Sequence, residues 1–214
     1  MTYSIINTGS DGNATVVEDI LLLDCGLYYK KIKDYVDKLQ LVLLTHIHGD
    51  HFKKSTIKML AQERPTLRFG CCEWLIQDLL NCGVCAKNID VYDFNSAYIY
   101  SDDLKVQPVK LHHDVPQCGY KIEINGYKVF YATDTCTLDD VEAKDYDYYF
   151  VEANYLSDEE LHERALSIEY EERVKNTHMS REETVNWLLK NMSDTSKYEF
   201  MHQHKERKGM ENVN

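Results

Sequence analysis

One stretch constrains the fold of this chain more than any other, Leu41-Val-Leu-Leu-Thr-His-Ile-His-Gly-Asp-His-Phe52. Its apolar first part predicts a buried strand, and Gly49 predicts a tight turn after it. Unpartnered imidazoles and carboxylates are costly to bury, and they repel one another when charged. A divalent metal removes both costs, because neutral imidazole and ionised carboxylate are natural ligands of such ions. We therefore predict that four side chains of this turn bind metal: His46, His48, Asp50 and His51.

The overall composition predicts an ordinary globular protein. With 214 residues, of which 43% are hydrophobic and 28% charged, the chain suits one domain better than two. We expect that domain to cover residues 1–208, with a disordered tail over residues 209–214. The sequence shows no apolar run of about 18 residues and no secretory signal. Its seven cysteines, an odd number, favour reduced thiols, so we predict a cytoplasmic protein that contacts no membrane.

The formal net charge of −12 excludes a protein coated in basic surface. It leaves nucleic acid open as a substrate, because a local basic rim can act within an acidic whole. Bound metal ions also add positive charge that the formal count omits. The charge therefore weakens a nuclease hypothesis without deciding it.

Apolar segments alternate between strand and helix spacing, which predicts an α/β chain. Strands are expected over residues 3–7, 14–18, 20–24, 41–44, 67–70, 90–94, 97–100, 104–110, 119–124, 127–132, 147–151 and 198–201. Helices are expected around 32–39, over 52–61 and 72–81, in one or two pieces within 156–175, and after Ser180. Asn125-Gly126 predicts a hairpin turn, and Ser180 with Glu183 predicts a capping box.

A metal-competent side chain directly follows several of the predicted strands. His113 comes after residues 104–110, Asp134 after 127–132 and His202 after 198–201. One such residue alone is usually a cap or a surface residue. Because ligand-binding loops gather where the strands of an open sheet end, the repetition predicts that these three residues join the first cluster in one site.

The order of these motifs resembles the metallo-β-lactamase superfamily, whose H-x-H-x-D-H signature is matched by residues 46–51. The resemblance implies an α/β fold, the four-layer αββα sandwich, and a hydrolytic site with two divalent ions, Zn²⁺ or alternatively Mn²⁺. Three residues match the ligands of the first ion: His46, His48 and His113. Three match those of the second ion: Asp50, His51 and His202. Asp134 matches the carboxylate that bridges both ions, and Asp24 matches an acidic residue that supports the ligand loop from behind.

Two nuclease groups of this superfamily resemble the chain. Runs shared with the small bacterial double-strand DNA exonuclease group are Gly9-Ser-Asp-Gly-Asn13, Leu23-Asp-Cys-Gly26, His113-Asp114, Gly119-Tyr120, Thr133-Asp134 and Glu152-Ala-Asn154. Positions shared with the tRNA 3′-processing endonucleases (RNase Z) are Glu152, His178 and His202. The resemblance implies three catalytic residues: Asp50, Glu152 and His178. His178, held by Glu152, would protonate the leaving oxygen or bind a non-bridging phosphate oxygen.

The chain departs from the DNA-nuclease pattern at two places. Ser180-Arg-Glu-Glu stands where that group has an asparagine shortly after its His-x-Ser, and His202-Gln-His204 stands where it has His-Leu-Ser. His204 therefore remains a rival to His202 as the last ligand. His112, next to His113, receives no role.

The cysteines form a weaker pattern. Cys82-Gly-Val-Cys85 has the C-x-x-C spacing of zinc and redox sites, and Cys71 and Cys72 precede it. Cysteine is also among the commonest small buried residues, which favours structural thiols over a four-thiolate site.

The expected activity is metal-dependent hydrolysis of nucleic-acid phosphodiester bonds by a hydroxide that bridges two metal ions. DNA is favoured over RNA as the substrate. Three lysines near the motifs are candidates for phosphate contacts, although solvated surface explains them equally well: Lys53, Lys54 and Lys205. The alternative is a small-molecule metallo-hydrolase that acts on a thioester, a lactone or a cyclic nucleotide. A non-catalytic, metal-stabilised binding protein is the third hypothesis, and the intact ligand set argues against it.

Overall fold

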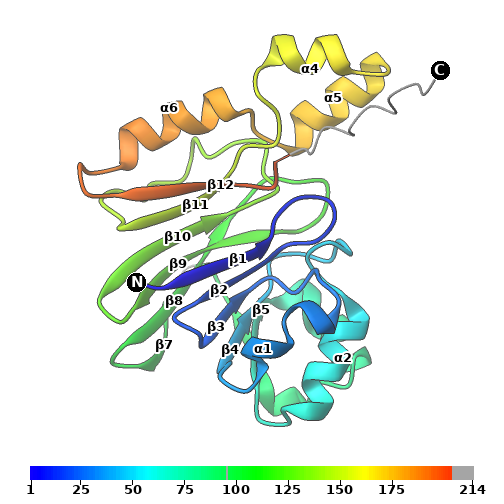
Figure 1. Ribbon diagram of the computed structural model, residues 1–214, viewed down its shortest axis with the longest axis vertical. Coiled ribbons are helices and arrows are strands. Elements are labelled where there is room, and N and C mark those ends of the chain that lie inside the picture. The colour runs from blue at the N-terminus through cyan, green and yellow to red at the C-terminus, as the bar shows by residue number, and fades with distance from the viewer. Residues whose placement is uncertain (95, 204–214) are drawn as a thin grey trace, which may run out of the picture.

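The computed structural model describes residues 1–94 and 96–203 and arranges them in four layers (Figure 1). Two six-stranded sheets lie face to face, and helices cover the outer face of each sheet. This arrangement is the αββα sandwich expected from the sequence. The expected domain end at residue 208 and the tail over residues 209–214 lie outside the described residues and stay predictions.

The first sheet comes from the N-terminal half of the chain, in the order β1-β2-β3-β4-β5-β6. Its strands are β1 (Tyr3–Asn7), β2 (Ala14–Val17), β3 (Leu21–Leu23), β4 (Leu41–Leu43), β5 (Arg68–Cys72) and β6 (Ile89–Tyr92). The connecting helices are α1 (Lys33–Val36), α2 (Lys54–Glu63) and α3 (Ile76–Asn81), with the 3-10 turns η1 (Tyr29–Lys31), η2 (Glu73–Leu75) and η3 (Ala86–Asn88). Strands β3 to β6 run parallel, so their carboxyl ends share one edge of the sheet.

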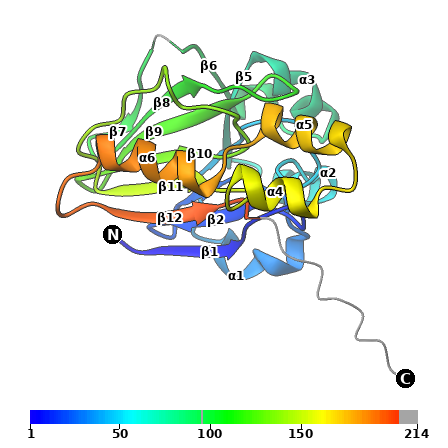
Figure 2. The same ribbon diagram turned by 90° about the horizontal axis from the view of Figure 1, so that it is seen from above.

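The second sheet has the order β12-β11-β10-β9-β8-β7. Its strands are β7 (Tyr98–Ser101), β8 (Leu104–Lys110), β9 (Cys118–Ile124), β10 (Tyr127–Ala132), β11 (Tyr148–Glu152) and β12 (Lys197–Met201). The remaining helices are α4 (Asp158–Arg164), α5 (Ile168–Thr177) and α6 (Arg181–Asn191). Because β10, β11 and β12 are parallel, they end at the same edge. The two views place α6 over the second sheet and α4 and α5 beside the edge where β12 ends (Figures 1 and 2).

Side chains of successive strand residues point to opposite faces, and this alternation separates the apolar cores. On β4, Val42 packs among the residues of the outer helices, whereas Leu41 and Leu43 lie in the core between the two sheets. On the outer face of the second sheet, Trp187 and Leu188 of α6 pack against strand residues in a further core. A strand that is buried on both faces has a continuous apolar sequence, which explains the Leu41–Leu44 segment.

Local signals placed several turns and caps correctly. The hairpin pairs Tyr127 with Ile124, and its turn residues have the positive φ angles of a two-residue hairpin turn, 49° at Asn125 and 78° at Gly126. Ser180 caps α6, and the reciprocal bonds with Glu183 complete the capping box. The polar segment over residues 156–175 forms two helices, α4 and α5.

Two predicted helices differ from those in the structure. The helix expected over residues 72–81 starts only at Ile76, because Cys72 still belongs to β5 and a 3-10 turn follows it. The helix expected around residues 32–39 is a single turn, Lys33–Val36. In both places apolar residues at helical spacing pack into the core without requiring a continuous helix, so periodicity alone did not determine the helix bounds.

The cysteines do not form a four-thiolate site in the described part of the chain. Cys71 and Cys72 are consecutive on β5 and therefore lie in different cores, Cys71 beneath the helices and Cys72 between the sheets. Cys82 is buried and Cys85 is exposed, and each is a free thiol. The groups suited to metal among the described residues contain only histidine, aspartate and glutamate. In the same part of the chain, no helix has the length and apolar character needed to cross a membrane.

Candidate metal centre

The ends of five strands bring the predicted ligands to one edge of the sandwich. The loop after β4 carries the first motif, β8 leads to His113, β10 to Asp134, β11 ends at Glu152 and β12 leads to His202. Two of these residues adopt left-handed backbone just past their strands, with φ of 53° at Asp134 and 50° at His202. Such backbone is strained for a side-chain-bearing residue and occurs where the surrounding structure enforces it. At both residues this backbone turns the chain sharply toward the site as it leaves the strand.

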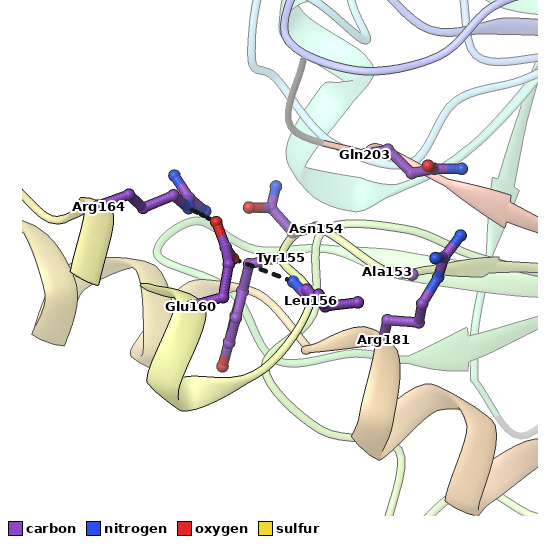
Figure 3. A pocket seen from close by; sticks show the side chains of 8 residues that line it. All are labelled: Ala153, Asn154, Tyr155, Leu156, Glu160, Arg164, Arg181 and Gln203. Carbon is purple, nitrogen blue, oxygen red and sulfur yellow. Dashed lines mark hydrogen bonds and ion pairs between the residues drawn. The ribbon is translucent and has the colours of Figure 1, made fainter. Parts of the chain in front are cut away.

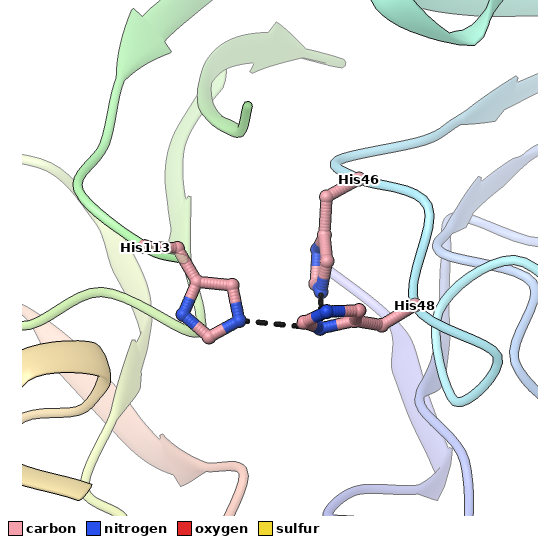
Figure 4. A group of neighbouring side chains, drawn as sticks. All are labelled: His46, His48 and His113. Carbon is pink, nitrogen blue, oxygen red and sulfur yellow. Dashed lines mark hydrogen bonds between the residues drawn. The ribbon is translucent and has the colours of Figure 1, made fainter. Parts of the chain in front are cut away.

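Three histidines form the first cluster, in which a nitrogen of each ring points to a common centre (Figure 4). His48 Nδ1 lies 3.2 Å from His46 Nε2 and 3.2 Å from His113 Nε2. Zinc bonded tetrahedrally to imidazole at about 2.0–2.1 Å separates its ligand nitrogens by about 3.3 Å. The spacing of these three nitrogens therefore fits one tetrahedrally coordinated ion.

The second cluster joins two rings and two carboxylates. His202 Nε2 lies 3.3 Å from Asp50 Oδ2 and 3.4 Å from Asp134 Oδ1. His51 Nε2 lies 2.9 Å from Asp134 Oδ2 and 3.7 Å from Asp50 Oδ2. Asp134 also faces the first cluster, with Oδ1 4.0 Å from His113 Nε2. It is therefore placed between the two clusters, where a bridging ligand would lie.

The second nitrogen of three rings is held from outside the clusters. His51 donates its Nδ1 hydrogen to Asp24 Oδ2 at 2.7 Å, and His113 donates its own to the Thr177 carbonyl at 3.0 Å. His46 Nδ1 lies 2.9 Å from the Thr45 hydroxyl. Each contact fixes the ring orientation and the tautomer, so the lone pair is on the nitrogen that faces the cluster.

The donors and acceptors of the second cluster fit a bound cation. Because His51 donates from Nδ1 to Asp24, its neutral ring carries a lone pair on Nε2, which lies 2.9 Å from Asp134 Oδ2 and 2.8 Å from the Asn13 amide nitrogen. Asp134 Oδ2 is buried, and no donor among the described residues reaches it in good hydrogen-bond geometry. Two acceptors 2.9 Å apart in a buried place require a proton or a metal between them.

The electrostatics of the two clusters differ. Burial lowers the pKa of His46 well below its usual value, so this ring is a neutral ligand. Burial also disfavours a charged His51, but Asp134 and Asp24 outweigh it and raise the pKa of His51 well above its usual value. Burial opposes and Asp134 favours the charged form of His202 as well, and its pKa is raised to about 10. The carboxylates thus stabilise positive charge in the second cluster.

Asp24 supports the ligand loop from behind. It is fully buried and accepts hydrogen bonds from Thr45 N at 3.0 Å, Thr45 Oγ1 at 2.9 Å, His51 Nδ1 at 2.7 Å and the Tyr131 hydroxyl at 2.8 Å. These donors come from both sheets. One carboxylate therefore ties the loop that carries the first motif to the second half of the fold.

Replacing Asp24 by asparagine is expected to lower the metal affinity by about 10- to 100-fold. The amide keeps the shape of the carboxylate, but its nitrogen cannot accept hydrogen bonds, so His51 or Thr45 loses a partner. Competition with a chromophoric chelator measures the affinity. Asp19→Asn is the matched control, because Asp19 lies at the surface and, like Asp24, has a positive φ, which is 60° at Asp19. Equal metal affinity of the two variants would contradict the role of Asp24.

The backbone of the first motif is held by the turn between β1 and β2. Both the backbone N–H and the side-chain amide of Asn13 donate to the Asp50 carbonyl, at 2.6 and 3.2 Å. A Cβ atom on Gly26 would lie 1.7 Å from that same carbonyl oxygen, so only glycine fits there. The runs over residues 9–13 and 23–26, which resemble those of the DNA exonuclease group, thus both position the backbone of Asp50.

His178 and Glu152 form a pair beside the second cluster. His178 Nδ1 lies 2.5 Å from Glu152 Oε1, and the other carboxylate oxygen accepts from the Thr135 N–H at 2.5 Å. Burial lowers the pKa of His178, but the Glu152 carboxylate outweighs it and the net shift is upward. The His178 ring stacks on the His202 ring with centroids 5.1 Å apart. His178 is therefore oriented rigidly next to the ligands.

A cavity of about 220 Å³ opens onto both clusters. Asp50, His113, Asp134, His178 and His202 line it, together with residues of α5. Arg173 of α5 is exposed, and it is the arginine among the described residues that line this cavity. Sequence reasoning missed Arg173, because it lies in a polar helical segment that is typical of a solvated face.

Two of the predicted lysines, Lys53 and Lys54, do not line this cavity. Lys53 Nζ lies over the Tyr28 ring, 4.3 Å from its centroid, and Lys54 Nζ pairs with Asp78 at 2.8 Å. Lys205 lies outside the described residues, as does His204, the rival of His202. Of the two neighbouring histidines, the ring of His113 belongs to the first cluster, whereas His112 is exposed.

Asp114 is a further residue that sequence reasoning left without a role. Its Oδ1 lies 3.4 Å from His48 Nε2 and 3.2 Å from His113 Nε2, and its side chain is half exposed. A carboxylate at this place adds negative charge next to the first cluster. The only signal in the sequence was its position directly after His113.

A second cavity, of about 170 Å³, is lined by the segment after β11, by α4 and by the start of α6 (Figure 3). Asn154 forms part of its wall and donates to the His202 carbonyl at 3.2 Å. Arg181 and Arg164 also line it, and Arg164 pairs with Glu160 at 2.6 Å. The cavity shares no residue with the lining of the one that opens onto the metal clusters.

A known family model matches most of the chain. The β-lactamase superfamily domain matches residues 20–202, which include every predicted ligand. No curated protein sequence matches the chain. Solved structures with the same fold are similar over most of their length, although they share only 13–16% of their residues with this chain.

Three of these structures show the range of the fold. The metallo-β-lactamase fold protein YhfI from Bacillus subtilis is 16% identical, with a TM-score of 0.73 over 95% of this chain and 86% of that one. Human tRNase Z, short form, is 13% identical, with a TM-score of 0.72 over 96% and 93%. A diphosphatase from the PhnP family is 15% identical, with a TM-score of 0.62 over 94% and 85%. At these identities the similarity establishes the fold alone.

Proposed function

The chain belongs to the β-lactamase superfamily, and on that premise we propose that it is a two-metal phosphodiesterase that hydrolyses nucleic acid with water. The proposal combines two ligand clusters around one bridging carboxylate with the adjacent pair of His178 and Glu152. Two proteins of the same fold, a tRNase and a diphosphatase, make phosphoryl chemistry a reasonable extension to this chain.

We propose the same division of ligands between the two ions that the sequence resemblance implies. The first ion would be held by His46, His48 and His113, the second by Asp50, His51 and His202, and Asp134 would be shared. Divalent ions there, Zn²⁺ or alternatively Mn²⁺, supply a Lewis acid for a phosphoryl oxygen and an activated water nucleophile at neutral pH. The 3.2 Å spacing of the nitrogens in the first cluster is compatible with Zn²⁺, whose usual geometry is tetrahedral.

The proposal of a phosphodiester substrate rests on the pair of His178 and Glu152. Glu152 is fully buried and holds His178 Nδ1, while the ring lines the cavity beside Asp134 and His202. Phosphodiester cleavage needs a group that binds a non-bridging oxygen or gives a proton to the leaving alkoxide. His178 is placed for that task without being needed as a ligand, because each cluster has three ligands and the shared Asp134.

The proposed contact with the rest of the substrate is made by Arg173 and not by the lysines near the first motif. Arg173 lines the cavity and is exposed, so its guanidinium can pair with a phosphate next to the scissile one. We favour DNA over RNA as the substrate because the shared sequence runs are those of a DNA-nuclease group. The net charge of −12 makes such local cations the main source of attraction for nucleic acid.

A small-molecule metallo-hydrolase is the second candidate function. The cavity of about 220 Å³ is small and the protein is acidic, and both features suit a thioester, lactone or cyclic nucleotide. Such a substrate would use the same ligand clusters. It would have less need of His178, because a thiolate leaving group departs without a proton.

Activity toward a panel of substrates tests the proposal. Metal-loaded protein is expected to cleave bis-p-nitrophenyl phosphate and labelled single- or double-stranded DNA, and a chelator is expected to abolish the activity. RNA of the same sequence, a thioester, a lactone and a cyclic nucleotide complete the panel. Turnover of a thioester or lactone without any phosphodiester cleavage, with Zn²⁺ and with Mn²⁺, would overturn the proposed function in favour of the second candidate.

A further inference from the structure

A large cavity adjoins the first ligand cluster and has no role in the activity described above. Its volume is about 400 Å³, within the range of about 300–1,000 Å³ of small-ligand sites, whereas the cavity over the metal ligands holds about 220 Å³. His113 and Asp114 line both cavities. A group bound in the larger cavity would therefore be directly connected to a phosphate at the clusters.

Two aromatic rings form part of the wall of this cavity. Trp74 and Phe94 lie with ring centroids 6.1 Å apart and planes inclined by 36°, and both side chains are half-buried. The indole N–H of Trp74 donates to the Thr45 carbonyl at 3.4 Å, which connects the ring to the residue before His46. Aromatic side chains that line a cavity are platforms for stacking nucleobases.

Gln117 provides the polar feature of the wall. Its side chain is only 3% exposed, and its amide nitrogen donates to the carbonyls of Thr133 and Asp134. Because both partners are acceptors, the amide can be oriented in only one way, with Oε1 as its free end. Oε1 has no hydrogen-bond partner among the described residues. A buried acceptor without a donor costs free energy, and a small movement of the Gln117 side chain toward the cavity would let a ligand supply the donor.

We propose that this cavity binds the nucleobase next to the scissile phosphate, stacked on Trp74 and Phe94, with Gln117 Oε1 accepting a hydrogen bond from an N–H of the base. The proposal rests on the proposed function, since it names the part of the substrate that this cavity recognises. Every natural base has an aromatic face and an N–H group, so the two features of the wall match one kind of ligand.

The mixed character of the wall favours a base over an acyl chain. Lys110, His112 and Asn176 are exposed residues of the same lining, and they surround the aromatic pair with polar groups. A purely apolar group would leave the Gln117 acceptor unpaired and would gain nothing from these residues. A nucleobase pairs with both kinds of surface, and Lys110 adds a cation for the backbone that carries the base.

Binding of three phosphates to metal-loaded protein tests the proposal without catalysis. The probes are adenosine 5′-monophosphate, purine riboside 5′-monophosphate, which lacks the exocyclic amine, and ribose 5-phosphate, which lacks the base. Stacking predicts that ribose 5-phosphate binds about tenfold or more weakly than adenosine 5′-monophosphate. Loss of one hydrogen bond predicts that the purine riboside compound binds about two- to tenfold more weakly. Equilibrium dialysis gives all three dissociation constants.

A variant locates the base at the aromatic pair. Trp74→Ala is expected to bring the affinity for adenosine 5′-monophosphate within about threefold of that for ribose 5-phosphate, because stacking on the indole is lost. Tyr198→Ala is the control, since Tyr198 is a half-exposed ring on β12 that lies against Phe200, with the ring planes inclined by 57°, and does not line the cavity. Fluorescence quenching in the unchanged protein reports on Trp74, because the other tryptophan, Trp187, is 7% exposed and packed on Phe130.

The results separate this proposal from the proposed function. If ribose 5-phosphate binds as well as adenosine 5′-monophosphate, the cavity does not recognise a base, whatever the substrate panel shows. Phenyl phosphate is a fourth ligand for the same dialysis: if it binds as tightly as the nucleotide, the cavity accepts any aryl group and base recognition is wrong. If the base preference is present but no phosphodiester is cleaved, the base site stands and the proposed reaction is wrong. Should Trp74→Ala not fold, the ligand series on the unchanged protein still decides.

Discussion

Replacing Asp134 by asparagine will remove metal from the protein and reduce phosphodiesterase activity by about 10³-fold or more. Asp134 is the carboxylate that faces both clusters, and its oxygens lie 2.9 Å from His51 Nε2 and 3.4 Å from His202 Nε2. Burial opposes its charge, but His51 and His202 outweigh this effect and hold the pKa of Asp134 well below its usual value. A neutral amide cannot replace that charge. Elemental analysis after dialysis measures the metal content.

The substitution is suited to the position because asparagine tolerates the left-handed backbone of Asp134, where φ is 53°. Asp145→Asn is the matched control: Asp145 has a φ of 56° and is exposed. It is expected to keep full metal content and activity. If the Asp134 variant retains two ions per chain, Asp134 does not bridge them, and the assignment of the second cluster is wrong.

Replacing His178 by alanine will reduce kcat by about 10²- to 10⁴-fold while leaving the metal content unchanged. The ring is held by Glu152 at 2.5 Å and lines the cavity, but it is additional to the three ligands of each cluster. Its loss therefore removes a donor for a phosphate oxygen or the leaving oxygen and leaves the ions in place. Kinetics with bis-p-nitrophenyl phosphate and elemental analysis of the same samples give both quantities.

The chain contains a matched control for this pair. His162 also contacts a glutamate, with Nδ1 2.8 Å from Glu171, but its side chain is 75% exposed and lies on α4. His162→Ala is expected to leave kcat unchanged. Loss of metal from the His178 variant would mean that His178 is itself a ligand. Unchanged kcat with full metal content would mean that the pair only supports the second cluster.

Short-range patterns in the sequence predicted the elements on which the site is built. Asn125-Gly126 specified its hairpin because two adjacent residues that tolerate positive φ are enough for that turn. Ser180 and Glu183 specified the start of α6 because a capping box involves only four consecutive residues. In both cases the physical cause lies within a few residues, so the sequence shows it directly. The helix expected over residues 72–81 was wrong at its start because the pairing of β5 with its neighbours extends to Cys72.

The sequence by itself determined the fold class and the cluster of His46, His48, Asp50 and His51, because so many ligand side chains directly after a buried strand are costly to fold without a metal ion. The sequence also predicted that His113, Asp134 and His202 join them, but only the tertiary structure decided the distances between these side chains. The carboxyl ends of parallel strands come together through sheet register, and this register brings Asp134 within 3.4 Å of His202.

The same holds for residues without a motif. Arg173, Trp74 and Gln117 belong to segments with no distinctive pattern, yet packing places them around the cavities at the clusters. Lys53 and Lys54 follow the first motif directly, yet they contact Tyr28 and Asp78 instead of lining the cavity. Position along the chain fixes the identity of a neighbour only within a turn or a strand. Beyond that distance, the direction of a side chain depends on which layers pack together, and the sequence does not state this locally.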